Sequence, residues 1–158
     1  MPVAPKTAGI IPRRLERNDH MGNPGYNLFV PLVGYVALWI LGSALFLVYF
    51  KIFGIAIDMK RPVAMVKQLP VGLAVVTVPA CSFVAFFVAA AIFRYAFSAR
   101  LDLTHLIYLG VFSLLWTIVL DFLITVVGER IDIRAFPMNL MYLFAWFAIV
   151  PAVVLGGR

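Results

Sequence analysis

Asp121 is the one acidic residue that lies deep within a long apolar stretch of the sequence. An ionised carboxylate at the centre of a bilayer costs about 3 kcal/mol on insertion scales, so such a residue normally faces protein or water. Small and polar residues accompany it at steps of three or four, namely Gly110, Ser113, Thr117, Thr125 and Gly128. Residues at these spacings share one face of a helix. The sequence therefore predicts a polar stripe that faces other helices.

Residues of the other expected helices reach the depth of Asp121 when they are counted inward from the ends of the apolar stretches. The count selects Ser43, Thr77 and Tyr142. We expect these residues to form a polar layer with Asp121 inside the membrane. The layer is either a proton or cation site for transport or a structural device in which the carboxyl hydrogen-bonds helices together.

The residue pattern argues against catalysis. His20 precedes the apolar stretches, and His105 lies near the start of the third one, on a different helical face from Asp121. A nucleophile needs a neighbouring histidine or second carboxylate to activate it, and the apolar stretches supply none beside a serine or cysteine. Two histidines so placed cannot hold a haem together within the bundle. We expect a protein that is not an enzyme and has no metal site.

Trp39, Trp116 and Trp146 fall near the middle of the expected helices, whereas tryptophan usually prefers the membrane interface. In this position they could pack against a bound lipid, a quinone or a pigment. Ordinary aromatic packing is the commoner arrangement. No cofactor is therefore predicted from these residues.

The elements that must position these side chains are membrane-spanning helices. Of the 158 residues, 64% are hydrophobic and only 13% are charged, about half the charge of a typical soluble domain. The apolar residues form long runs, which predict an all-α, polytopic integral membrane protein. Four transmembrane helices are expected, at residues 28–52, 71–97, 103–128 and 138–156. Asp102 or Thr104 is placed to cap the third.

The first 27 residues differ in composition from the rest of the chain. Residues 1–27 are polar and rich in proline, and residues 28–158 are expected to form the membrane domain. The arm has too little apolar surface to fold by itself. Its cations Arg13, Arg14 and Arg17 are expected to contact the acidic groups of a partner.

A second polar segment separates the first two expected helices. Residues 58–70 alternate charged and apolar side chains and include Lys60 and Arg61. This pattern predicts a short amphipathic helix that lies in the membrane interface. Lys60 and Arg61 would then contact lipid headgroups.

Small residues at helical spacing mark two packing faces. They are Cys81, Ala85 and Ala89 in the second expected helix, and Ala145, Ala148, Ala152 and Gly156 in the fourth. Such faces allow helix backbones to approach closely in membranes.

The charge of the chain indicates where the protein resides. Its net charge is +6, from cations spread over both ends of the expected helices, which is typical of contact with anionic lipid and not of nucleic-acid binding. We expect a multi-pass protein of a bacterial cytoplasmic membrane. The cations of the arm favour cytoplasmic N- and C-termini.

Two functions agree with this pattern. The first is a non-catalytic subunit of a larger membrane complex, which contacts lipid and other membrane subunits and shapes assembly, lipid contacts or a cofactor environment. The alternative is a small transporter or channel, acting as a homo-oligomer, that uses the Asp121 stripe as a proton, cation or solute pathway.

Overall fold

The computed structural model describes residues 24–57, 65, 68–97, 101–128 and 140–158, which form helices and the turns that flank them. The helices are α1 (Pro24–Ile52), α3 (Val71–Phe97), α4 (Leu103–Phe122), its π-helical continuation η1 (Leu123–Gly128), and α5 (Leu140–Gly157). The predicted all-helical fold is confirmed, and the four helices lie close to their predicted bounds. α1 starts inside the predicted arm, and residues 1–23 with their three arginines lie outside the described residues.

Three of these helices are long and apolar enough to cross a bilayer. They are α1 from Asn27 onward, α3 and α4, with mean hydropathies of 2.1, 2.3 and 1.9. α5 has a shorter apolar stretch, Tyr142–Gly157. Large apolar side chains on all four helices point outward, among them Ile40, Val76 and Phe147. This arrangement is compatible with a multi-pass membrane protein whose outer surface faces lipid.

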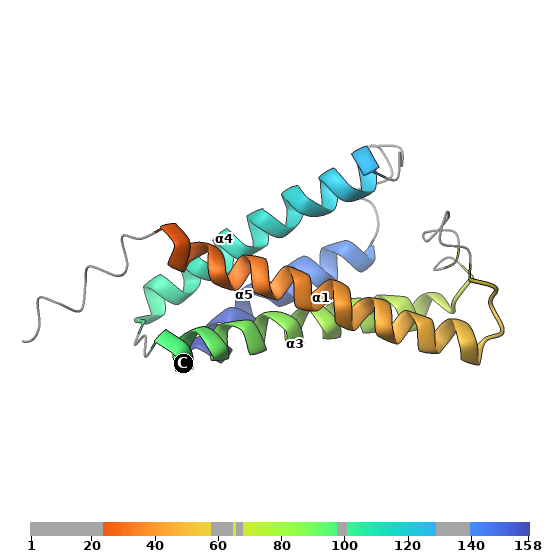
Figure 1. The fold of residues 1–158 in the computed structure, drawn as a ribbon, viewed down its shortest axis with the longest axis horizontal. Coiled ribbons are helices and arrows are strands. Elements are labelled where there is room, and N and C mark those ends of the chain that lie inside the picture. The colour runs from red at the N-terminus through yellow and green to blue at the C-terminus, as the bar shows by residue number, and fades with distance from the viewer. Residues whose placement is uncertain (1–23, 58–64, 66–67, 98–100, 129–139) are drawn as a thin grey trace, which may run out of the picture.

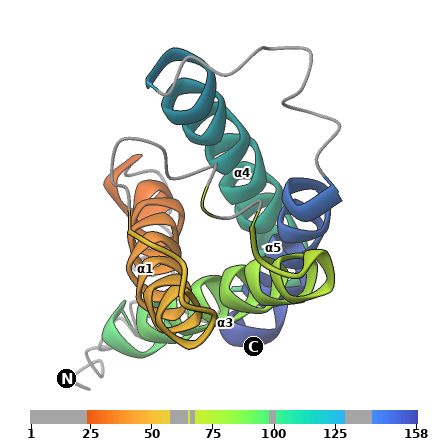
Figure 2. The same cartoon turned by 90° about the vertical axis from the view of Figure 1, so that its right-hand side faces the viewer.

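Neighbouring helices in the bundle run in opposite directions. α1 and α4 run one way and α3 and α5 the other, so the start of α1 and the end of α5 lie at the same end of the bundle (Figure 1). α3 packs most extensively on α5 and then on α1, whereas α4 packs on α5 and only slightly on α1. α4 is inclined, so that its end and η1 move away from the other helices (Figure 2).

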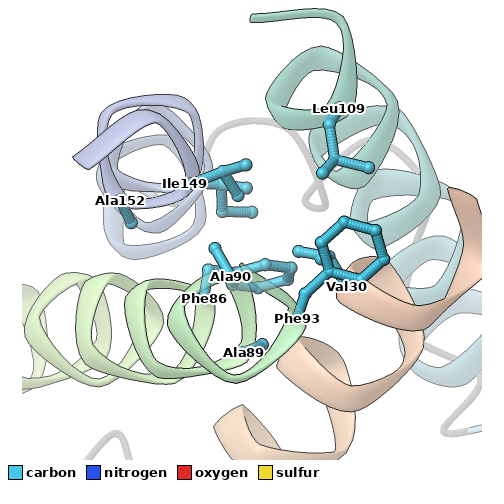
Figure 3. Close-up of a cluster of buried hydrophobic side chains, with 9 residues drawn as sticks. Val30, Phe86, Ala89, Ala90, Phe93, Leu109, Ile149 and Ala152 are labelled. Carbon is cyan, nitrogen blue, oxygen red and sulfur yellow. The ribbon is translucent and has the colours of Figure 1, made fainter. Parts of the chain in front are cut away.

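One hydrophobic cluster joins all four helices. Figure 3 shows Val30 of α1, Phe86 and Phe93 of α3, Leu109 of α4 and Ile149 of α5 around a common centre. Val30, Phe86 and Ile149 are fully buried. In a bilayer, whose lipid is as apolar as these side chains, the close packing of the cluster and not the removal of water would stabilise the bundle.

The two predicted small faces meet between α3 and α5. Ala85 and Ala89 are buried on α3, and Ala152 and Gly156 are buried on α5. At Gly156 the backbones come so close that a Cβ would lie 2.3 Å from the carbonyl oxygen of Phe87. A glycine is therefore required at this crossing.

α1 ends because of a glycine that the apolar pattern did not reveal. Gly54 has a φ of 66°, and the Ile55 N–H donates to the carbonyl of Phe50 at 2.9 Å. This is the hydrogen bond of a Schellman cap. Met65 and Leu69 are buried against Phe50. The remaining part of the predicted interfacial helix, with Lys60 and Arg61, lies mostly outside the described residues.

Asp102 caps α4 as the sequence predicted. Its carboxylate accepts the backbone N–H of His105 at 2.8 Å and also contacts the His105 ring. The backbone hydrogen bond, followed by the ring contact, holds the pKa of Asp102 below its ordinary value.

Candidate functional site

Asp121 lies between three helices and is 9% exposed. The Tyr35 hydroxyl of α1 donates to Oδ1 at 2.9 Å, and the Trp146 indole N–H of α5 donates to Oδ2 at 2.9 Å. Each carboxylate oxygen therefore accepts a hydrogen bond from a different helix. In the membrane interior, bonds of this kind can hold helices together.

Two further aromatic side chains surround these donors. Trp39 packs against Tyr35, and the two rings meet edge to face with centroids 6.4 Å apart. Tyr142 lies against Trp146 with centroids 6.2 Å apart and interacts electrostatically with Tyr35. Asp121 thus lies within a shell of two tyrosines and two tryptophans.

The stripe on α4 brings Asp121 to this position. Gly110, Ser113, Thr117 and Asp121 are all buried on one face of α4. Because Gly110 has no side chain, α5 approaches closely, and a Cβ at Gly110 would lie 3.2 Å from the Cα of Val150. The side chain of Thr125, the remaining polar residue of the stripe, lies outside what the structure describes.

Both donors lie deep within their helices. Tyr35 follows the first residue of α1 by eleven positions, and Trp146 precedes the last residue of α5 by eleven. At 1.5 Å per residue each lies about 16 Å along its helix from the end of the bundle where α1 starts and α5 ends. Asp121 follows the first residue of α4 by eighteen positions, so the inclined α4 reaches these donors near its own end.

The three residues that were expected near Asp121, namely Ser43, Thr77 and Tyr142, lie in three different surroundings in the structure. Tyr142 is near it, through Trp146 and Tyr35. Ser43 is exposed on the outer surface of α1, and the Thr77 hydroxyl pairs with that of Tyr49 at 3.2 Å. Counting inward from the end of α1 selects Ser43, which lies about two helical turns from Tyr35, the α1 residue that bonds Asp121. The count fails because the ends of α1 and of the inclined α4 lie at different levels of the bundle.

Tyr35 is the residue that the sequence reasoning missed. A signal for it was present, because a tyrosine in the middle of a charge-free span carries a hydroxyl that needs a partner as much as Asp121 does. Trp146 was noted as a mid-span tryptophan but not as a donor. The pairing of these residues depends on the relative levels of three helices, which sequence spacing does not give.

The remaining buried polar groups of the bundle fall into two classes. The Ser82 hydroxyl donates to the carbonyl of Ala145 at 3.0 Å, and the Thr117 hydroxyl donates to the carbonyl of Ser113 at 2.9 Å. In contrast, the Ser113 hydroxyl and the Trp116 indole nitrogen are buried and have no hydrogen-bond partner among the described residues.

The side chains that surround Asp121 indicate what the carboxyl can do. The two donors described, Tyr35 and Trp146, are neutral and aromatic, so they orient and stabilise the carboxyl. Among the described residues, no group of three or more His, Cys, Asp or Glu side chains could hold a metal ion. Comparison of the chain with protein-family models, curated proteins and solved structures finds no match.

Proposed function

We propose that the protein is a non-catalytic integral membrane subunit of a larger membrane complex, and that Asp121 holds its bundle together. The observation that carries this proposal is the pair of hydrogen bonds from Tyr35 and Trp146 to the two oxygens of Asp121. α4 packs only slightly on α1. The Tyr35 bond is therefore a principal link between these two helices.

All four helices cross the membrane in this proposal. α5 has 18 residues and covers about 27 Å, slightly less than the hydrocarbon core. It packs against α3 and α4 and places Trp146 at the depth of Asp121, which supports a full crossing. Residues 58–70 then lie in the interface, both termini lie in the cytoplasm, and the membrane is the bacterial cytoplasmic one.

The outer surface of the bundle supports a protein neighbour. Ser43 presents its hydroxyl outward in the middle of α1, and Trp39 is 45% exposed. Lipid offers a hydroxyl no hydrogen-bond partner, and tryptophan prefers the membrane interface, whereas a neighbouring helix can satisfy both residues. η1 also extends away from the rest of the bundle (Figure 2).

The polar segments outside the bundle would complete the contacts of such a subunit. Arg13, Arg14 and Arg17 pair with acidic groups of the partner in this proposal. Lys60 and Arg61 contact anionic headgroups.

A second candidate function is a small homo-oligomeric transporter or channel. The buried polar stripe of Ser113, Thr117 and Asp121 favours it, because buried ionisable residues within spans often mark proton or ion pathways. The same residues then conduct instead of holding helices together.

Purification from native membranes in a mild detergent separates the two functions. The first predicts a complex with a partner at fixed stoichiometry, measured by native mass spectrometry. The Asp121→Asn variant should give a lower yield of folded protein. Asp102→Asn makes the same chemical change at the exposed N-cap of α4, where asparagine caps as well as aspartate does, and serves as the matched control, with an unchanged yield.

Flux measurements test the transporter or channel alternative. A homo-oligomer without a partner that conducts protons or cations in liposomes would contradict the subunit proposal. Loss of that flux in Asp121→Asn, with normal folding, would assign the stripe to transport.

A further inference from the structure

Two buried polar groups on α4 have no hydrogen-bond partner within the part of the chain that the structure describes. They are the Ser113 hydroxyl and the Trp116 indole nitrogen, and Ser113 is 0% exposed. Buried polar groups in folded proteins are almost always hydrogen-bonded, so an unpaired one often marks a bound water or ligand. Two unpaired groups within one turn of a helix point to a common partner.

The geometry of α4 brings the two groups together. Residues three apart are neighbours on a helix surface. The Trp116 ring stacks on Phe112 one turn earlier, with centroids 6.4 Å apart and planes 30° apart. The indole therefore leans back along α4 toward the turn of Phe112, the residue that directly precedes Ser113.

The two groups also share their hydrogen-bonding character. The indole N–H can only donate, and the serine hydroxyl is free to donate. The next hydroxyl along the stripe, that of Thr117, already donates to the Ser113 carbonyl. The unmet requirement is thus an acceptor that can take two hydrogen bonds.

We propose that Ser113 and Trp116 form a binding site, within the membrane, for a single oxygen atom that accepts a hydrogen bond from each. The oxygen comes from a buried water or from the carbonyl group of an apolar, membrane-soluble molecule such as a quinone. Both carry two lone pairs. A water also needs acceptors for its hydrogens, and the Thr117 oxygen lies one turn away to take one.

The indole proton of Trp116 reports directly on the site. The full-length protein contains three tryptophans, so selective ¹⁵N labelling of the indoles gives a simple NMR spectrum, and Trp116→Phe identifies the Trp116 signal. Trp146 donates to Asp121 and provides an internal reference for a hydrogen-bonded indole. The proposal predicts a Trp116 proton shifted downfield, as that of Trp146 is.

Ser113→Ala tests whether the two donors share one acceptor. It should shift the Trp116 signal and lower the thermal midpoint, because the bound oxygen loses one of its two donors. Thr104→Ala removes an exposed hydroxyl of α4 and, as the matched control, should leave both unchanged. If the Ser113 hydroxyl truly lacks a partner, Ser113→Ala removes a buried unsatisfied group and raises the midpoint, which would overturn the proposal.

Two further NMR measurements distinguish whether the oxygen belongs to a quinone or to a buried water. A titration with a short-chain quinone that shifts the Trp116 signal in the wild type but not in Ser113→Ala identifies a carbonyl ligand. A cross-peak between the Trp116 proton and water, with no response to quinone, identifies a buried water. A Trp116 signal at the position of an unbonded indole, or a bonded one that responds to neither, shows that no bound oxygen is present.

Discussion

Gly156→Ala adds one methyl group at the closest approach of α3 and α5. The new Cβ would lie 2.3 Å from the carbonyl oxygen, 3.0 Å from the carbonyl carbon and 3.1 Å from the Cα of Phe87. An ordinary carbon–oxygen contact is about 3.3 Å. The obstacle is backbone and cannot rotate away, so the two helices must separate by about 1 Å.

The separation sets the size of the effect. A gap of about 1 Å forfeits up to roughly half of the dispersion energy of each contact across it, and α3 and α5 share the most extensive contact in the bundle. Inserting a methyl group into a well-packed core typically costs about 1–3 kcal/mol. We expect the upper part of that range, about 2–3 kcal/mol, because backbone must move.

Gly42→Ala is the matched control. Gly42 also lies in a helix, but a Cβ there meets nothing within 4 Å, and alanine should stabilise α1 by about 0.5–1 kcal/mol through its helix propensity. The measurement is reversible unfolding in mixed detergent micelles, followed by tryptophan fluorescence. If Gly156→Ala unfolds at the same denaturant concentration as Gly42→Ala, α3 and α5 do not cross as closely as described.

Three further predictions concern the site, the α4 cap and the core. A double-mutant cycle of Tyr35→Phe and Asp121→Leu, which removes both acceptor oxygens, should give a coupling of about 1 kcal/mol in the same unfolding assay; additive effects would contradict the bond. Because the pKa of Asp102 is lowered, its ionised side chain stabilises α4 above about pH 4, and this stabilisation is lost as the pH falls further. The thermal midpoint should therefore drop on acidification, and it should drop less in Asp102→Asn. Phe86→Ala, at a fully buried position, should lower the free energy of unfolding by about 2–3 kcal/mol, because the variant loses packing contacts and leaves a cavity even in lipid. Phe147→Ala, at a position that is 75% exposed, should cost less than about 1 kcal/mol. Equal effects would place Phe86 outside the core.

The helices were predictable because their signals are local. Long apolar runs with few charges define α1, α3 and α4, and Asp102 marks the start of α4 by its capping position. The small residues of α3 and α5 share a face by spacing alone. Each of these inferences depends on residues within a few turns of one another.

The site was only partly predictable because it depends on the relative levels of different helices. The burial of Asp121 followed from its charge, and the buried face of Ser113 and Thr117 from helical periodicity. The pairing with Tyr35 spans 86 residues and requires the inclination of α4. Sequence spacing contains no measure of that inclination, so Ser43 was expected where Tyr35 lies.

The two donors of Asp121 become available at different times during synthesis. Tyr35 precedes Asp121 in the chain and is already in place when α4 leaves the ribosome, whereas Trp146 follows it by 25 residues. At 5–20 residues per second this delay is about 1–5 s. Of the two donors described, the nascent bundle offers Asp121 the Tyr35 hydroxyl of α1 alone during that interval. Release of α5 from the ribosome then adds the Trp146 indole to a carboxyl that was synthesised before it.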